Sequence, residues 1–271
     1  MTSRSLPALA AVLGLLSAGC SSPVTVSRQS NLMEYLSASE QKAPAAEAVL
    51  QLPLAVGVAF LPGGSTKNSD NNFMNSSRGG TVFITAEQER RLAGEIQARF
   101  AAKPWVKDVK VIPSFYLSEH GGLGDVEKVA ALNHVDIMIL VALNQVQFTN
   151  PQWYSWTNWT FVGAYTVKGD KNDTSTYIDA SVFHVPSRTM LFRADGTSTL
   201  KGSATWAQRE EKLRVKSMES LHLAMDALCL HLDDAAASFR DDALQGRRKD
   251  VRLLDRDGIP AGAPGYDPAK S

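Results

Sequence analysis

The sequence predicts an α/β domain: a three-layer sandwich in which a parallel βαβαβ half is extended by antiparallel hairpins and followed by a long C-terminal helix. Three observations predict this class. Residues 54–61 and 135–143 are near-continuous apolar runs, typical of strands buried on both faces of a parallel sheet. Segments with helical periodicity separate the strands of this half. From residue 159 onward, apolar and polar residues alternate with a period of two, which indicates antiparallel strands joined by short turns.

The first crossover helix has a clear start and a clear buried face. Thr85-Ala-Glu-Gln88 matches a capping box, which predicts a helix beginning there. Leu92, Ile96 and Phe100 recur every four residues and should form its buried stripe. Lys103-Pro104 should end it, because the residue before a proline avoids the helical conformation.

A second strand and a second helix follow. Residues 106–117 form the predicted strand, and Pro113 should move its second half to a sheet edge or a bulge. Asp125 is the expected cap of the next helix. Its apolar residues are Val126, Val129, Ala130 and Leu132. This order of elements implies right-handed parallel crossovers.

The second half should add antiparallel strands at 159–168, 176–185 and 189–200, with Pro186-Ser187-Arg188 as the tight turn of the second pair. The final strong element is a helix from about residue 208 to 243. Its expected buried face consists of Leu221, Met225, Leu228 and Leu232. Cys229 lies within this apolar face, where a thiol is usually inert.

The first residues are typical of a bacterial lipoprotein signal. Arg4 is followed by an apolar stretch at 6–16, which is too short to span a bilayer, and then by small residues and Cys20. We therefore expect residues 1–19 to be removed and Cys20 to be acylated (palmitate and diacylglycerol), which anchors the chain to a lipid bilayer. Ser21 is not the aspartate that usually marks inner-membrane retention. The expected location is the outer membrane, with the domain facing the periplasm.

The remaining boundaries follow from composition. Residues 20–52 are expected to be a lipidated tether, 53–245 the periplasmic α/β domain, and 246–271 a disordered tail rich in Pro and Gly. The chain has 28 basic and 28 acidic residues, so it lacks the positive field that nucleic acid binding requires. The two cysteines are Cys20 and Cys229, and acylation of the first leaves no disulfide.

No residue pattern points to catalysis or to a cofactor. The five histidines lack H-E-x-x-H spacing and the chain has no G-x-S-x-G motif, so we expect no metal, no cofactor and no enzyme activity. One alternative stays open. The glycine-rich loops at 63–80 and 119–124 should follow parallel strands, where a small-ligand-binding or enzymatic α/β domain would place its site.

An aromatic cluster is the best candidate for contact with a partner. Trp153, Tyr154, Trp156 and Trp159 fall within seven residues, at an expected junction between a loop and a strand. Exposed aromatic side chains dominate the hot spots of protein interfaces. The alternative is that these rings pack beneath the sheet.

Several segments give the chain a resemblance to the rhombotarget (rhombotail) lipoproteins. The resemblance spans most of the predicted domain and is carried by the segments 31–36, 54–60, 144–148, 159–165, 171–174 and 187–193. It implies a cell-envelope lipoprotein with no assigned reaction. The resulting hypothesis is a non-enzymatic binding or adaptor module that contacts an envelope protein in envelope or surface-protein biogenesis.

Overall fold

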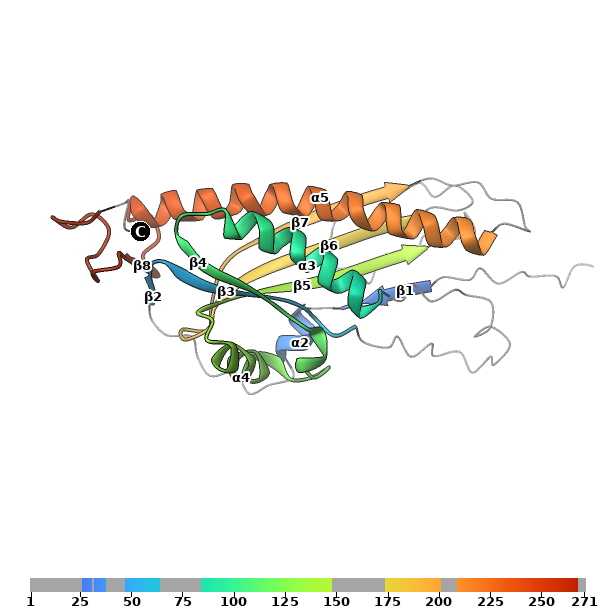
Figure 1. The fold of residues 1–271 in the computed structure, drawn as a ribbon, viewed down its shortest axis with the longest axis horizontal. Coiled ribbons are helices and arrows are strands. Elements are labelled where there is room, and N and C mark those ends of the chain that lie inside the picture. The colour runs from blue at the N-terminus through green and yellow to red at the C-terminus, as the bar shows by residue number, and fades with distance from the viewer. Residues whose placement is uncertain are drawn as a thin grey trace, which may run out of the picture.

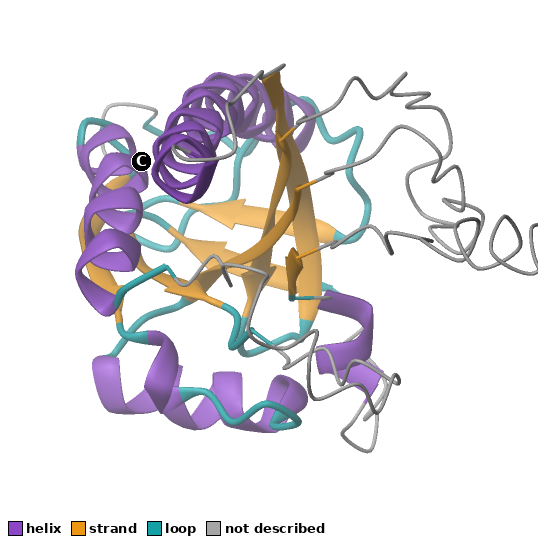
Figure 2. Cartoon of the chain, turned by 90° about the vertical axis from the view of Figure 1, so that its right-hand side faces the viewer, coloured by secondary structure: helices purple, strands orange, loops and turns teal. Residues whose placement is uncertain are grey.

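The protein is a three-layer α/β structure in which helices cover both faces of one mixed sheet (Figures 1 and 2). The fold class predicted from the sequence is confirmed. The computed structural model describes residues 26–30, 32–37, 47–63, 84–147, 174–200 and 209–267 of the 271-residue chain.

The described strands of the main sheet lie in the order β4-β3-β5-β6-β7, and β1 also pairs with β5. β3 is parallel to β4 and β5, whereas the pairs β5–β6, β6–β7 and β1–β5 are antiparallel. Every residue of β3 is buried, because β3 is an inner strand with helices on both sides, and this explains its unbroken apolar sequence. The strands are β1 (Val26–Gln29), β3 (Leu54–Phe60), β4 (Val106–Ile112), β5 (Ile137–Gln147), β6 (Thr174–His184) and β7 (Thr189–Leu200).

Two hydrophobic cores fill the space between the layers. The larger core joins one face of the sheet to α3 (Ala86–Ala101) and α5 (Arg209–Leu244). The smaller core joins the opposite face to α2 (Leu32–Ser37) and α4 (Gly122–Asn133). The predicted buried stripes of α3 and α5 are confirmed, and these side chains are buried in the larger core: Leu92, Ile96, Phe100, Leu221, Met225, Leu228 and Leu232.

The predicted capping box starts α3. The Thr85 hydroxyl accepts a hydrogen bond from the Gln88 amide at 3.2 Å, and the Gln88 side chain accepts one from the Thr85 amide at 2.8 Å. Both bonds satisfy amides that have no partner inside the helix.

α5 lies very close to β7 at one glycine. A Cβ atom at Gly196 would stand 2.0 Å from the Ala224 carbonyl oxygen and 2.5 Å from the Leu228 amide nitrogen. Real Cβ atoms do not approach backbone so closely, so the helix can cross β7 here only because residue 196 has no side chain.

A buried polar network joins α5 to the sheet near the start of the helix. Gln145 on β5 donates to the Thr176 hydroxyl and the Ser217 carbonyl, both at 2.8 Å, and accepts from the Ser217 hydroxyl at 2.6 Å. Thr176 and Ser220 share a further hydrogen bond of 2.8 Å. All four side chains are buried, and the connected network fixes the register of the helix on the sheet.

The structure differs from the expected boundaries at both ends of the domain. Residues 20–52 were expected to be a tether, but β1 lies in the main sheet and β2 (Ala48–Gln51) pairs in parallel with β8 (Val251–Leu254). Residues 246–271 were expected to be a disordered tail, but Val251 and Leu253 of β8 belong to the larger core. These strands have four residues each, and their pairing partners are distant in the sequence, so local periodicity could not reveal them.

Three local predictions also need correction. β4 ends before Pro113, and the chain continues as a 3-10 helix at Ser114–Tyr116 rather than as a strand. Asp125 lies within the first turn of α4 instead of capping it, since Gly121 holds the cap position. Leu132 is 78% exposed, because a helical advance of about 100° per residue turns it away from Val129 and Ala130.

The close approach at Gly196 predicts that Gly196→Ala destabilises the domain by about 3 kcal/mol, because either the helix or the strand must move. Urea unfolding would measure the loss. The control is Gly94→Ala in α3, where no atom lies within 4 Å of the added Cβ. That change should stabilise the domain by about 0.5–1 kcal/mol. Equal stability of the Gly196→Ala variant and the wild type would contradict the tight crossing.

Candidate functional site

The crevice in which open α/β sheets usually bind ligands is filled by the chain itself in the described residues. Such a crevice lies beyond the carboxyl end of the central strand, where successive crossover helices cover opposite faces. β3 ends where the Leu61 amide donates to the Val141 carbonyl at 2.8 Å. Along the same edge of β5, the Ser30 amide then donates to the Leu143 carbonyl at 3.1 Å, and β1 pairs with the rest of β5. β1 thus occupies the position beyond β3.

The glycine loop at 119–124, which was one alternative ligand site, is closed by a carboxylate of the chain. Asp125 accepts a hydrogen bond from the Ser118 amide at 3.2 Å, and a Cβ at Gly121 would stand 2.0 Å from its Oδ2 atom. Hydrogen bonding to Ser118 lowers the pKa of Asp125. A phosphate at the start of α4 would meet this negative charge. Of the other glycine loop, the structure describes Gly63, while 64–80 lie outside the described residues.

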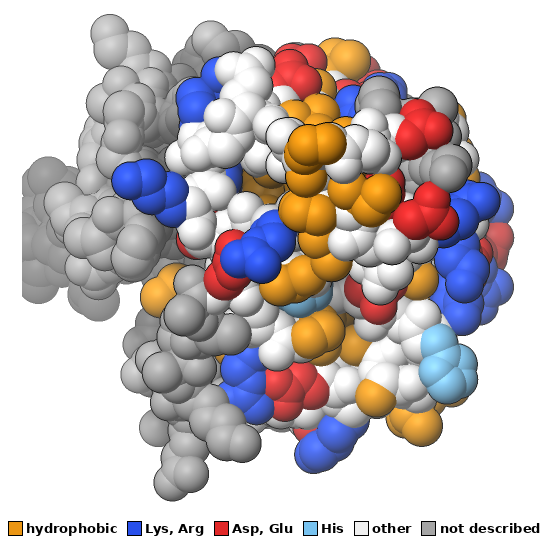
Figure 3. All heavy atoms as spheres, turned by 90° about the vertical axis from the view of Figure 1, so that its left-hand side faces the viewer, with side chains coloured by type: hydrophobic (Ala, Val, Ile, Leu, Met, Phe, Trp, Pro, Cys, Tyr) orange, Lys and Arg blue, Asp and Glu red, His pale blue; other side chains and the backbone are white. Residues whose placement is uncertain are grey.

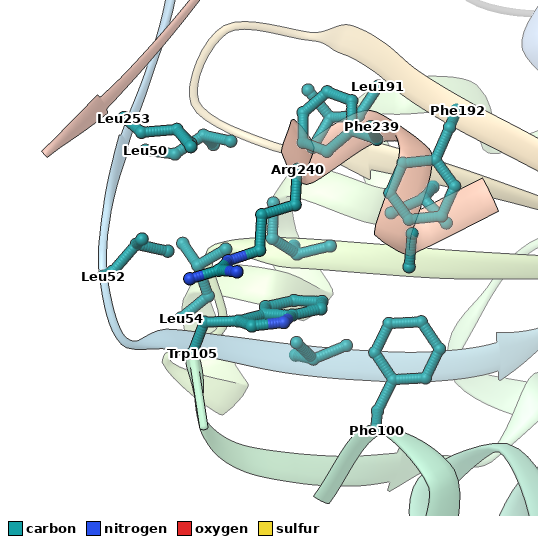
Figure 4. A pocket seen from close by; sticks show the side chains of 14 residues that line it. Leu50, Leu52, Leu54, Phe100, Trp105, Leu191, Phe192, Phe239, Arg240 and Leu253 are labelled. Carbon is teal, nitrogen blue, oxygen red and sulfur yellow. The ribbon is translucent and has the colours of Figure 1, made fainter. Parts of the chain in front are cut away.

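An apolar cavity lies instead at the opposite end of the domain. It has a volume of about 30 Å³ and lies between the larger core, the β2–β8 pair and the last part of α5 (Figure 4). Its walls come from every layer on that side of the sheet. They are Leu50, Leu52, Leu54, Val56, Phe100, Trp105, Ile137, Val182, Leu191, Phe192, Ala236, Phe239, Arg240 and Leu253.

Arg240 is the one charged side chain in the cavity wall. It reaches from α5 towards Trp105 and Leu54 (Figure 4). Its Nε atom is buried without a hydrogen-bond partner, and no ion pair joins Arg240 to any other residue in the described parts of the chain. A buried guanidinium nitrogen without a partner costs free energy, so this cation is suited to an anionic ligand.

Neighbouring arginines at this end are already paired. Arg248 forms two hydrogen bonds with Asp250, at 2.8 and 2.6 Å, and its guanidinium lies 5.3 Å from the ring centroid of Phe239. Arg252 binds Glu47 at 3.1 and 2.7 Å. On the same end face, apolar side chains form a band between charged groups (Figure 3).

A second candidate is an exposed aromatic pair. Phe115 and Tyr116 lie on the 3-10 helix after β4, with ring centroids 4.5 Å apart, and are 76% and 56% exposed. The Ser114 hydroxyl donates to the Glu89 carboxylate of α3 at 2.6 Å and holds this turn in place. Adjacent exposed aromatic side chains on an anchored turn are typical of protein contact surfaces.

A polar cluster on β6 and β7 is internally paired. Asp179 is buried, and burial raises its pKa, while Arg193 contacts its carboxylate at 2.8 Å and opposes that rise. Burial also raises the pKa of Tyr177 to about 12, and Arg193 donates to its hydroxyl at 3.1 Å. Arg193 is therefore already paired within this cluster and is a poor candidate for binding an anionic ligand.

The site residues predicted from the sequence lie outside the described residues. Cys20, Trp153, Tyr154, Trp156 and Trp159 lie outside the described residues, as does the predicted strand at 159–168. The structure therefore neither places nor tests the predicted anchor and aromatic cluster.

Cys229 is buried in the core, as the apolar face of its helix predicted. Burial raises the pKa of its thiol to about 11, so it stays protonated at neutral pH. Among the described residues, no group of three or more His, Cys, Asp or Glu side chains could hold a metal ion.

Sequence reasoning missed Arg240, Phe115 and Tyr116. Arg240 lies near the end of α5, and the periodicity of this long helix does not show which of the helix's charged residues reaches into the core. Phe115 followed the alternation expected of a strand, and Pro113 was the available signal that this alternation would stop.

No helix within the described ranges has the length and apolar character needed to cross a membrane.

The comparisons with known proteins give distant structural likeness only. No family model matches the chain, and no curated protein matches its sequence. PelC from Paraburkholderia phytofirmans, solved as a dodecamer, is 12% identical over 73% of this chain and 97% of PelC, with a TM-score of 0.28. Lipoprotein GNA1162 from Neisseria meningitidis is 10% identical over 65% of this chain and 96% of its own, with a TM-score of 0.25.

A further similar structure is protein XCC0632 from Xanthomonas campestris, described as DUF330. It is 8% identical over 71% of this chain and 98% of its own, with a TM-score of 0.25. The similar structures thus include a bacterial lipoprotein, but these identities and TM-scores assign neither family nor function. The resemblance to rhombotarget lipoproteins stays a prediction.

The contact between Asp125 and Ser118 predicts a pH-dependent effect of Asp125→Asn. The folded pKa of this carboxyl is lowered, so its contribution is present above the unfolded value of about 4 and is lost as the pH falls through the folded pKa. At pH 7 the variant should be less stable by about 1 kcal/mol, a low value for a charged hydrogen bond near the surface. Urea unfolding at pH 7 and pH 3 measures this, and a difference that stays constant between the two would contradict the assignment.

Proposed function

We propose that this chain is a bacterial outer-membrane lipoprotein, anchored through acylated Cys20, whose periplasmic α/β domain is a non-enzymatic binding module for an envelope protein. The signal-like segment that ends at Cys20 supports the anchor. The proposed role is that of an adaptor in envelope or surface-protein biogenesis.

The observation that carries the binding role is the exposed pair of Phe115 and Tyr116. The two rings project from a turn that Ser114 ties to α3, next to β4, which is the edge strand at this side of the described sheet. Aromatic side chains on a pre-ordered turn lose little conformational entropy on binding, which suits them as anchors of an interface.

Three features of the described residues support binding rather than catalysis. β1 fills the position beyond β3, and Asp125 closes the glycine loop before α4. The cavity is lined by hydrocarbon apart from Trp105 and Arg240, so its walls offer no pair of groups for general acid–base work.

The anchor should hold the domain near the bilayer. Only residues 21–25 separate Cys20 from the first residue of β1, and a fully extended chain of that length spans about 20 Å. β1 lies at one end of the molecule, whereas β2, β8 and the end of α5 lie at the other (Figure 1). The cavity is therefore expected to point away from the anchoring leaflet, into the periplasm.

The anchor predicts that Cys20→Ala removes the protein from the outer-membrane fraction, because the acylated residue is lost. Sucrose-gradient fractionation followed by immunoblotting measures the distribution, and Cys229→Ala serves as the matched control. Outer-membrane association that survives Cys20→Ala would contradict anchoring by acylation.

The partner surface predicts that Phe115→Ala together with Tyr116→Ala lowers capture of an envelope protein by in-cell crosslinking about tenfold or more. Leu230→Ala is the matched control, because Leu230 is an exposed apolar residue on α5. A parallel variant replaces Trp153, Trp156 and Trp159 with Ala. Each variant must first be shown to fold and to fractionate with the membrane. Equal capture by wild type and both aromatic variants would overturn the proposed adaptor surfaces.

A further inference from the structure

We propose that the cavity under the end of α5 binds a single acyl chain that ends in a carboxylate, with Arg240 receiving the carboxylate. This inference is independent of the proposed adaptor role. It rests on the lining of the cavity, on the unpaired guanidinium and on the construction of the cavity wall.

The lining selects a hydrocarbon ligand. Leucines of β2 and β8 form one wall, the sheet forms another, and Phe100, Ala236 and Phe239 of the helices complete it. Apart from Arg240 and the indole of Trp105, none of the lining side chains carries a hydrogen-bonding group. A peptide in this space would bury several backbone amides and carbonyls without partners, whereas an acyl chain has none to satisfy.

The charge selects the head group. Arg248 and Arg252 at the same end are neutralised by Asp250 and Glu47, while Arg240 has no ion pair among the described residues. A guanidinium binds a carboxylate through two parallel hydrogen bonds, and this bond is stronger where water is excluded. A carboxylate here would also satisfy the buried Nε atom of Arg240.

The wall of the cavity can yield to admit a chain. A volume of about 30 Å³ has room for one or two water molecules, so an acyl chain needs more room than the cavity offers. β2 and β8 form a separate two-stranded sheet that pairs with no described strand of the main sheet. Since two-stranded pairs have little stability of their own, this pair is the wall that we expect to move outward.

The test is titration of the purified Cys20→Ala chain, which carries no acyl chain of its own, by isothermal titration calorimetry. The ligand is dodecanoate below its micellar concentration, and the matched ligands are dodecanol and dodecyltrimethylammonium. We expect saturable binding of one dodecanoate, with at least tenfold weaker binding of the neutral and cationic ligands.

Three variants locate the site. Arg240→Gln should weaken dodecanoate binding about tenfold or more, because the charge-assisted bonds are lost. Ala236→Val should abolish binding by filling the cavity, and its unfolding midpoint is measured alongside, because added carbons in a packed core can destabilise it. Arg91→Gln is the control, because Arg91 is exposed on α3 and does not line the cavity, and it should bind as the wild type does.

Absence of saturable binding by the wild type, equal binding of all three ligands, or unchanged affinity of Arg240→Gln would each overturn the proposal. The purified chain is tested without a partner protein, so these outcomes do not depend on the adaptor role. Likewise, failure of the crosslinking experiment to capture an envelope protein would not bear on the proposed acyl-chain site.

Discussion

The fold depends on the packing of α5 across the antiparallel strands. This helix has 36 residues, about 54 Å at 1.5 Å per residue, and runs from the Gln145–Ser217 network at one end to the cavity at the other. Because Gly196 has no side chain, α5 can lie directly against β7, and its buried face packs in the larger core. One close crossing and one polar network therefore set how far the helix reaches over the sheet, and so where Arg240 lies.

Elements with strong local signals were predictable. The uninterrupted apolar run at β3, the capping box at Thr85 and the buried stripe of α5 each follow from short-range physics, and the structure confirms them. β1, β2 and β8 were missed because four residues carry too little periodicity, and their place depends on partners more than 100 residues away. Arg240 was missed because only the assembled cavity distinguishes it from the other arginines of α5.

The two ends of the molecule suit different tasks. At the β1 end, the chain enters the fold six residues after Cys20 and fills the position beyond β3 that related architectures leave for ligands. At the other end, the two-stranded β2–β8 sheet covers an apolar cavity, and its cation, Arg240, has no ion pair among the described residues. In the proposed account, the anchored end is closed and the end that faces the periplasm can open.

Hydrogen exchange of the Cys20→Ala chain, with and without saturating dodecanoate, tests this account most directly. We predict that amides of β2, β8 and the last turns of α5 exchange faster than those of β5 and β6 in the free chain, and that dodecanoate slows their exchange selectively. Unchanged exchange of the β2 and β8 amides on adding dodecanoate would contradict this prediction. Slower exchange at β1 and α2 instead would contradict it as well.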